Sequence, residues 1–206
     1  MKKLIVLLLV CLLPLSALAE MDADGNVSVT LPGVEIFFTP IEGHCLTRES
    51  SASVFNRLGL SQRDVVPWME AYDVYALLFD QTGELEIQVM AYPTTDMDFD
   101  DQTTSGLERM REACEKFYIS QGYDVESAET YYTQDGHSYV RIAAAYTYED
   151  GFVEHMAEYF TCQSGYAVYV TAFPYEGPLT EMQIFLCESV VGSLWVSEDA
   201  STGEDE

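Results

Sequence analysis

Positively charged residues are scarce in this sequence. Lysine and arginine together number 9 against 35 aspartates and glutamates in 206 residues, so the formal net charge is −26. Proteins that bind nucleic acid neutralise phosphates with lysine and arginine, and a chain this acidic repels polyphosphates and anionic lipid surfaces. We therefore exclude nucleic acid as a partner and disfavour anionic membranes, whereas basic proteins and divalent cations remain electrostatically permitted.

Apolar runs long enough to span a bilayer are also missing. The chain opens with Lys2 and Lys3, continues with an apolar run over 4–13, breaks at Pro14 and reaches the small-residue triplet of 17–19. This layout is typical of a secretory signal peptide, and the run is about half of the roughly 20 apolar residues that a membrane span needs. We predict an export signal at 1–19, an extracellular, periplasmic or cell-envelope location, and no stable membrane insertion after processing.

The processed chain is the right size for one domain. It would begin at Glu20 with 187 residues, and the loss of Lys2 and Lys3 would take its net charge to −28. A chain of this length forms a single core more readily than two. We predict one domain over 20–196, followed by a disordered acidic tail over 197–206 that has no large apolar side chain to bury.

No catalytic motif stands out, and we predict neither a cofactor nor a catalytic residue. The sequence has no Gly-x-Ser-x-Gly turn of the serine hydrolases. His44 precedes Cys45, but neighbouring side chains on an extended strand point to opposite sides. A cysteine hydrolase that uses Cys45 with His137 or His155, brought near by folding, is therefore kept as an alternative hypothesis.

Alternating acids supply a weak metal candidate. Asp96, Asp98 and Asp100 have the spacing with which calcium loops begin, but Asp101 stands where an EF-hand needs glycine and Leu107 where it needs an acid. We favour a solvated loop whose carboxylates face the positive end of the next helix. A calcium-dependent binding module is the second alternative.

Two further spacings of charged residues are interpreted as structural. His155 and Glu158 are three apart, which suits a metal site on a helix, but their segment alternates like a strand. Glu154 and Glu158 would share one face of that strand about 13 Å apart, too far for a glycosidase pair. We interpret both glutamates as solvated or sheet-face acids.

Four cysteines follow the predicted signal, namely Cys45, Cys114, Cys162 and Cys187. An even number in an oxidising compartment permits two disulfides with three possible pairings. Cys114 and Cys187 fall on apolar positions of predicted helices, where a free cysteine behaves as a small hydrophobe. Disulfides and free thiols both remain open.

Turn residues and periodicity indicate the elements. Asp135-Gly136, Asp150-Gly151 and Ser164-Gly165 separate β-rich runs, which predicts a four-strand meander. Ser105 and Glu108 fit a capping box that starts a long helix ending near Gly122. The region 40–61 shows little pattern beyond a short helix near 52–58. The expected strands are 27–30, 34–39, 74–79, 85–92, 125–132, 138–148, 152–162 and 166–173.

Two more helices complete the prediction. One opens at Ser61 and carries Trp68 and Met69 despite Pro67. The other starts at 177–178, ends near 194–195, and has its core-facing positions at Leu179, Met182, Leu186 and Val190.

The expected fold class is therefore α+β, with an antiparallel sheet flanked by helices. This element order, with Leu31-Pro32-Gly33 before an aromatic strand, resembles the PsbP-like superfamily, which includes the DcrB-like envelope proteins. The resemblance implies a PsbP-like sandwich and an envelope or accessory role, and it assigns no functional residue.

Tyrosine is abundant, with 14 copies. We expect Tyr131 and Tyr132, and likewise Tyr146 and Tyr148, to lie on opposite sheet faces, so that one face forms a tyrosine platform for a glycan or peptide. The simpler interpretation is strand propensity. From sequence alone we expect an exported, acidic, non-catalytic binding or accessory protein whose partner is a protein, peptide or glycan.

Overall fold

The computed structural model describes residues 18–21 and 25–198. Most of the predicted signal, 1–17, and the last eight residues, 199–206, lie outside the described part. Within that part, no helix is long and apolar enough to cross a membrane.

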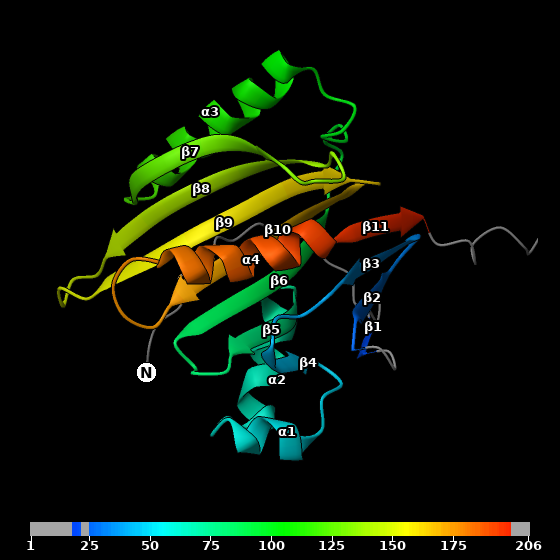
Figure 1. Cartoon of the computed structure of the whole chain (residues 1–206), viewed down its shortest axis with the longest axis vertical. Helices are drawn as coiled ribbons and strands as arrows, with labels where there is room; N and C mark the ends of the chain where they lie inside the picture. The colour runs from blue at the N-terminus through cyan, green and yellow to red at the C-terminus, as the bar shows by residue number, and fades with distance from the viewer. Residues whose placement is uncertain (1–17, 22–24, 199–206) are drawn as a thin grey trace, which may run out of the picture.

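Seven antiparallel strands form the larger of two sheets (Figure 1). They are β4 (Gly43–Thr47), β5 (Val74–Asp80), β6 (Leu85–Pro93), β7 (Asp124–Tyr132), β8 (Ser138–Thr147), β9 (Val153–Gln163) and β10 (Tyr166–Pro174). Their order across the sheet is β4-β5-β6-β10-β9-β8-β7, so the predicted meander and the predicted β5–β6 hairpin are both confirmed. The hairpin joins the meander through the pairing of β6 with β10.

The shortest turn of the meander, between β9 and β10, shows why its two-residue turn sequence predicted a hairpin. Only Ser164 and Gly165 separate β9 from β10, and their φ angles are 49° and 78°. A two-residue hairpin needs positive φ at both positions, because that twist matches the strands on either side. Glycine adopts it without strain.

Strand β4 was not predicted. It lies in the region of weak pattern and pairs with β5, and Gly43 opens it at φ 151°. A Cβ on this residue would collide with the carbonyl oxygen of Phe79. Gly43 is therefore required by the close approach of two strands.

Four short strands form the second sheet. They are β1 (Leu18–Met21), β2 (Val27–Leu31), β3 (Val34–Phe38) and β11 (Trp195–Glu198), in the order β1-β2-β3-β11. Two expectations about these strands were wrong. Glu20 and Met21 pair with β2 although no strand was expected before residue 27, and Ser197 and Glu198 pair with β3 although they were assigned to the tail.

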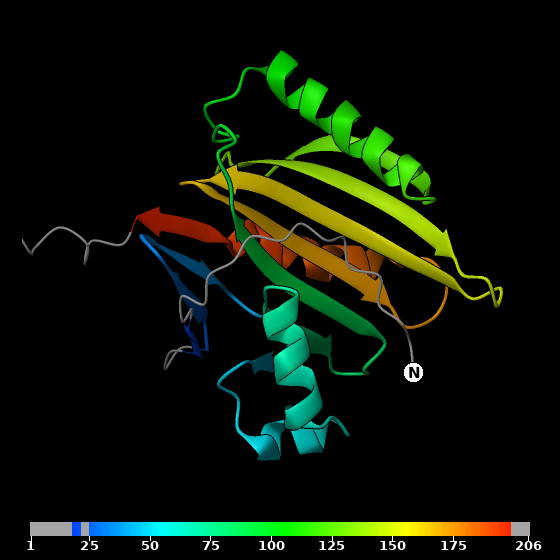
Figure 2. The ribbon, with the colours of Figure 1, turned by 180° about the vertical axis from the view of Figure 1, so that it is seen from behind.

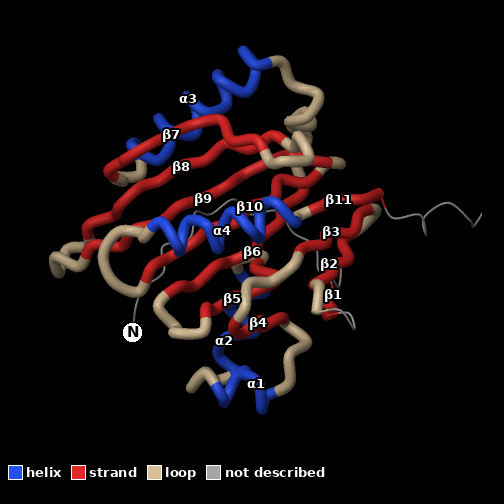
Figure 3. The backbone as a smooth tube through the Cα atoms, in the orientation of Figure 1, coloured by secondary structure: helices blue, strands red, loops and turns tan. Residues whose placement is uncertain are grey.

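The helices cover both faces of the larger sheet. They are α1 (Ala52–Arg57), α2 (Gln62–Ala71), α3 (Thr104–Ser120) and α4 (Glu181–Ser193). Figure 2 shows α2 and α3 on one face, and Figure 3 shows α4 lying over β10 on the other face and leading into β11. The small sheet packs on the same side as α4.

The main core lies between α4, the small sheet and one face of β5, β6 and β10. Cys187, Val190 and Val191 of α4 are buried there against Ile36 and Val170. A second core under α3 includes Phe99, Leu107, Val140, Ile142 and Phe160. A third, under α1 and α2, includes Leu46, Phe55, Met69 and Leu77.

Two helix details differ from the prediction. The side chain of Thr103, not Ser105, caps α3 by accepting a hydrogen bond from the Gly106 amide at 3.1 Å, and Glu108 instead pairs with Arg111. Since α4 begins at Glu181, its buried face falls on 187, 190 and 191, and Met182, which was expected in the core, is 65% exposed.

Candidate functional site

In the loop considered as a weak calcium candidate, two of the three aspartates interact with backbone and side-chain groups of the protein itself. Asp100 accepts a hydrogen bond from the Ser138 amide at 2.8 Å, and its other oxygen lies 2.7 Å from Nδ1 of His137. Asp98 accepts from the Ser164 amide at 3.2 Å, whereas Asp96 is exposed. The loop is therefore not simply solvated: it fastens the segment before α3 to two turns of the meander.

Across the part of the chain that the structure covers, no group of three or more histidine, cysteine, aspartate or glutamate side chains is arranged to hold a metal ion. The three loop aspartates are therefore not gathered around a common point.

Cys45 is a half-buried core thiol on β4, packed against the main core. Burial raises its pKa to about 12, whereas a cysteine nucleophile needs a lowered pKa. Cys114, Cys162 and Cys187 are also free, so none of these four cysteines forms a disulfide.

Glu158 is a partly buried acid on the sheet face, so of the two interpretations offered by the sequence the solvated one is wrong and the sheet-face one holds. It lies on the α3 side of β9, where it accepts hydrogen bonds from the Tyr118 hydroxyl at 2.6 Å and the Thr171 hydroxyl at 3.1 Å. Removal from water raises the pKa of its carboxyl. His155 lies on the opposite face of the strand, as the alternation predicted.

The tyrosines form a ladder beside α3 rather than an open platform. Neighbouring ring centroids are 4.9–5.8 Å apart along the series Tyr118, Tyr123, Tyr146, Tyr148 and Phe152. Tyr146 and Tyr148 thus lie on the same side of the sheet, contrary to expectation, because residues two apart on a strand share a face. Most of these rings are half-buried.

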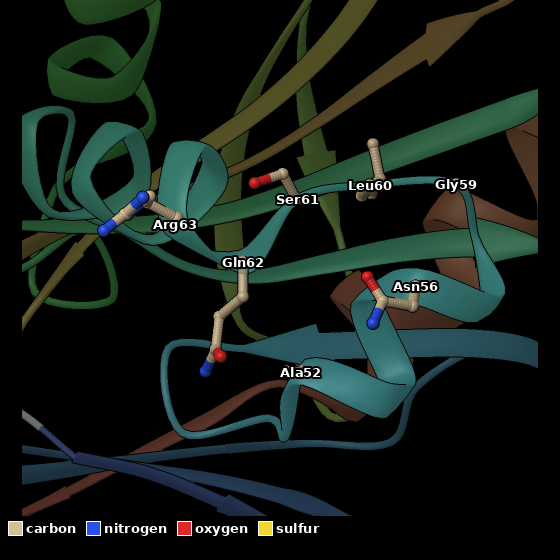
Figure 4. Close-up of a pocket in the computed structure, with 7 residues that line it drawn as sticks. All are labelled: Ala52, Asn56, Gly59, Leu60, Ser61, Gln62 and Arg63. Carbon is tan, nitrogen blue, oxygen red and sulfur yellow. The ribbon is translucent and has the colours of Figure 1, made fainter.

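One surface hollow of about 480 Å³ lies between α1 and α2 and opens widely to solvent (Figure 4). Asn56 and Arg63 at its rim are exposed, and the Gln62 side chain extends toward the start of α1, where it donates to the Ser50 carbonyl at 2.9 Å. Its polar groups are thus solvated or already used within the protein.

A second, more enclosed cavity of about 300 Å³ lies beneath the start of α4, on the sheet face opposite α3. We call it the α4 cavity. Three meander strands and the segment that leads into α4 supply its walls. The lining residues are Glu126, Ser127, Arg141, Ala143, His155, Met156, Ala157, Pro178, Leu179 and Ile184.

His155 is the distinctive group of the α4 cavity. Its Nδ1 atom and the Tyr139 hydroxyl are the two buried side-chain polar atoms, among the residues with described side chains, that lack a hydrogen-bond partner. Nδ1 lies 3.4 Å from a carboxylate oxygen of Glu126 but makes no hydrogen bond with it. Buried polar atoms are nearly always paired, so an unpaired one on a cavity-lining residue calls for an explanation, and an absent ligand is one.

Arg141 also lines the α4 cavity, and two neighbouring side chains hold its guanidinium in place. Its guanidinium pairs with Glu129 and donates to the Tyr159 hydroxyl at 2.9 Å. Tyr159 in turn donates to Glu188 of α4 at 2.9 Å. Burial raises the pKa of Tyr159, which keeps its hydroxyl a neutral donor. The network fixes α4 over β8 and β9.

The sequence pointed to His155 as a partner of Cys45 or as a metal ligand, and it did not point to Arg141 or Glu126. One signal was present: Arg141 is the only lysine or arginine after Lys116, and it interrupts the apolar run of a predicted strand. A lone charge at such a position needs partners. Nothing in the sequence indicated that Glu126 would face His155.

Comparisons with known proteins bear on the fold. No protein-family model and no curated protein matches this sequence. Among solved structures, the cyanobacterial PsbP (CyanoP) from Synechocystis sp. PCC 6803 is similar, with a TM-score of 0.41 and 15% identity over 88% of this chain and 93% of that one. The α+β class expected from the sequence is met by the two antiparallel sheets and the helices that cover them. A likeness at this level says nothing of function.

Proposed function

We propose that this protein is an exported, non-catalytic binding protein that holds a ligand of side-chain size in the α4 cavity. The ligand is a small organic molecule or one side chain of a peptide partner. A volume of about 300 Å³ is at the small end of ligand pockets, which combine apolar walls with a few convergent polar groups.

One observation carries the proposal: His155, whose Nδ1 lacks a hydrogen-bond partner, is one of the residues that line this cavity. A buried polar atom without a partner costs free energy, and a bound ligand would recover part of it. Leu179 and Ile184 supply apolar contact area beside the polar groups. The α1–α2 hollow offers no such unpaired atom.

The chemistry of the nucleophiles supports a non-catalytic role. The Cys45 thiol, with its pKa raised to about 12, is protonated at neutral pH. Ser127 lines the α4 cavity, but no hydrogen bond within residues 25–197 joins it to an imidazole that could activate it. Export is proposed from the N-terminal pattern of Lys2, Lys3 and the apolar run over 4–13.

The first test is whether the α4 cavity binds small molecules at all. The probes are alkyl amines, alcohols and carboxylates of four to six carbons, titrated into ¹⁵N-labelled protein. We expect chemical-shift changes at Ala143, His155 and Ile184. Ala143→Leu should fill the space and weaken binding at least about tenfold, because an added isobutyl group excludes the ligand.

The matched control places the same substitution, Ala52→Leu, at the open α1–α2 hollow, where it should leave binding unchanged. Circular dichroism and thermal unfolding check that both variants fold. Binding that survives Ala143→Leu, or shift changes confined to α1 and α2, would place the ligand elsewhere and end the proposal.

A further inference from the structure

We infer that the ligand of the α4 cavity is a primary ammonium on a short aliphatic stem, such as a lysine side chain or an alkylamine. The inference rests on the proposed function and specifies its ligand class. It follows from three features of the cavity. These are the Glu126 carboxylate and His155 imidazole at its polar end, the charges around it, and its apolar wall.

The polar end of the cavity brings a carboxylate and an imidazole together. A carboxylate oxygen of Glu126 and Nδ1 of His155 lie 3.4 Å apart without a hydrogen bond between them. An ammonium has three N–H donors and no acceptor, so it can donate to the Glu126 carboxylate, and to His155 as well when that ring carries its proton on Nε2. A hydroxyl has only one hydrogen to give, and a carboxylate has none.

The charges around the cavity favour a cation. The positive charge of Arg141 is already paired with Glu129, and Glu188 accepts from Tyr159. Glu126 is the one carboxylate among the residues that line the cavity, and the ionisable side chain opposite it is His155, which is charged only when protonated. The net charge of the whole protein is −26. A bound anion would meet this negative field with Arg141 already engaged, whereas an ammonium would complete the local pairing.

The opposite wall suits methylene groups. Pro178, Leu179 and Ile184 line it, together with Ala143 and Ala157 on the sheet. An aliphatic stem gains about 0.8 kcal/mol for each CH₂ removed from water. A metal ion would leave this wall unused and would find only Glu126 and His155 as ligands.

The experiment compares three probes of equal length, pentan-1-amine, pentan-1-ol and pentanoate, by calorimetry and chemical-shift mapping on the intact protein. The amine should bind about tenfold more tightly than the alcohol, and pentanoate should bind most weakly. Glu126→Gln keeps the shape but removes the charge. It should lower amine affinity about tenfold and leave alcohol affinity within about twofold.

Glu154→Gln is the matched control, because it removes the same charge one residue from His155 but on the α3 side of β9. It should leave amine affinity within about twofold. If the control lowers amine affinity as much as Glu126→Gln does, the effect is that of net charge and the assignment of Glu126 is wrong.

The probes also separate the two proposals. If the alcohol or pentanoate binds in the α4 cavity as tightly as the amine, the ligand class is overturned while the proposed function stands. If none of the three shifts residues of the cavity, both proposals fail.

Discussion

Glu158 has a carboxyl group on the sheet face that α3 covers, where contact with water is reduced. It accepts hydrogen bonds from Tyr118 of α3 and Thr171 of β10. These bonds favour the ionised form, but burial dominates and raises its pKa above the ordinary 4.5. A carboxyl whose pKa is raised by folding adds stability below its unfolded pKa and loses that contribution as pH rises through the folded value.

Because the raised pKa makes the ionised Glu158 carboxylate destabilising at high pH, its removal should stabilise the protein there. Glu158→Gln removes the titration and keeps an oxygen that accepts from Tyr118. The variant should therefore be about 1 kcal/mol more stable than the wild type at pH 8, and the gain should shrink as the pH falls through the raised pKa toward 4.5. Urea unfolding at several pH values measures it.

Glu154→Gln serves as the comparison, since Glu154 lies on the same face of β9 and accepts from Tyr148. It measures what the loss of one negative charge on this face does by itself. A Glu158→Gln variant that is less stable at pH 8 than at pH 5, relative to the wild type, would show that the hydrogen bonds outweigh burial.

At the scale of elements, β1 has an unusual position in the chain. It covers Leu18–Met21 and pairs with β2, so the cleavage site predicted between Ala19 and Glu20 falls in its middle. Processing there would remove the partners of Thr30 and Val29 and leave two residues of the strand. The unprocessed and processed chains would therefore differ at one edge of the small sheet.

We predict that the exported product begins at Glu20. Expression of the full chain in a secreting host, followed by intact-mass measurement and N-terminal sequencing of the exported protein, checks this. Ala19→Pro, which blocks the typical small-residue cleavage site, should leave a longer, cell-associated product. Recovery of the exported protein with Met1 still present would contradict the signal prediction.

Elements were predictable where their signals are local. The meander was read correctly because each reversal has its own turn pair, such as Asp150-Gly151, and each strand its own alternation. The capping of α3 was misplaced because Thr103 and Ser105 are both good caps, and only packing decides between them. Strand β4 was missed because its pairing with β5 depends on an approach of backbones far apart in sequence.

The candidate site could not be predicted from the sequence, because it too depends on contacts between segments that are far apart in the chain. Its polar groups come from β7, β8 and β9, and its apolar wall comes from the segment that begins α4. His155 was noticed for a spacing from Glu158 that a strand cannot use and as a possible partner of Cys45, not as part of a cavity. Which groups meet in a cavity depends on sheet register and helix placement, and neither is encoded within a single segment.

At the scale of the whole molecule, net charge is the dominant feature. A compact chain with a charge of −26 repels itself, and salt screens that repulsion. Raising NaCl from about 10 mM to about 300 mM should therefore raise the melting temperature, by roughly 2–5 °C. A melting temperature that stays constant or falls would mean that the acids are already neutralised by local contacts.

Melting temperatures measured with calcium and with magnesium, in place of NaCl, test the alternative hypothesis of a calcium-dependent binding module. Calcium and magnesium at equal ionic strength screen equally, so a difference between them measures specific binding. Asp98 and Asp100 already accept hydrogen bonds from Ser164 and Ser138, and a calcium ion would have to displace these amides. We therefore expect equal thermal shifts for the two ions. A larger shift with calcium, accompanied by calorimetric heat and lost in Asp98→Asn, would establish a calcium site at this loop.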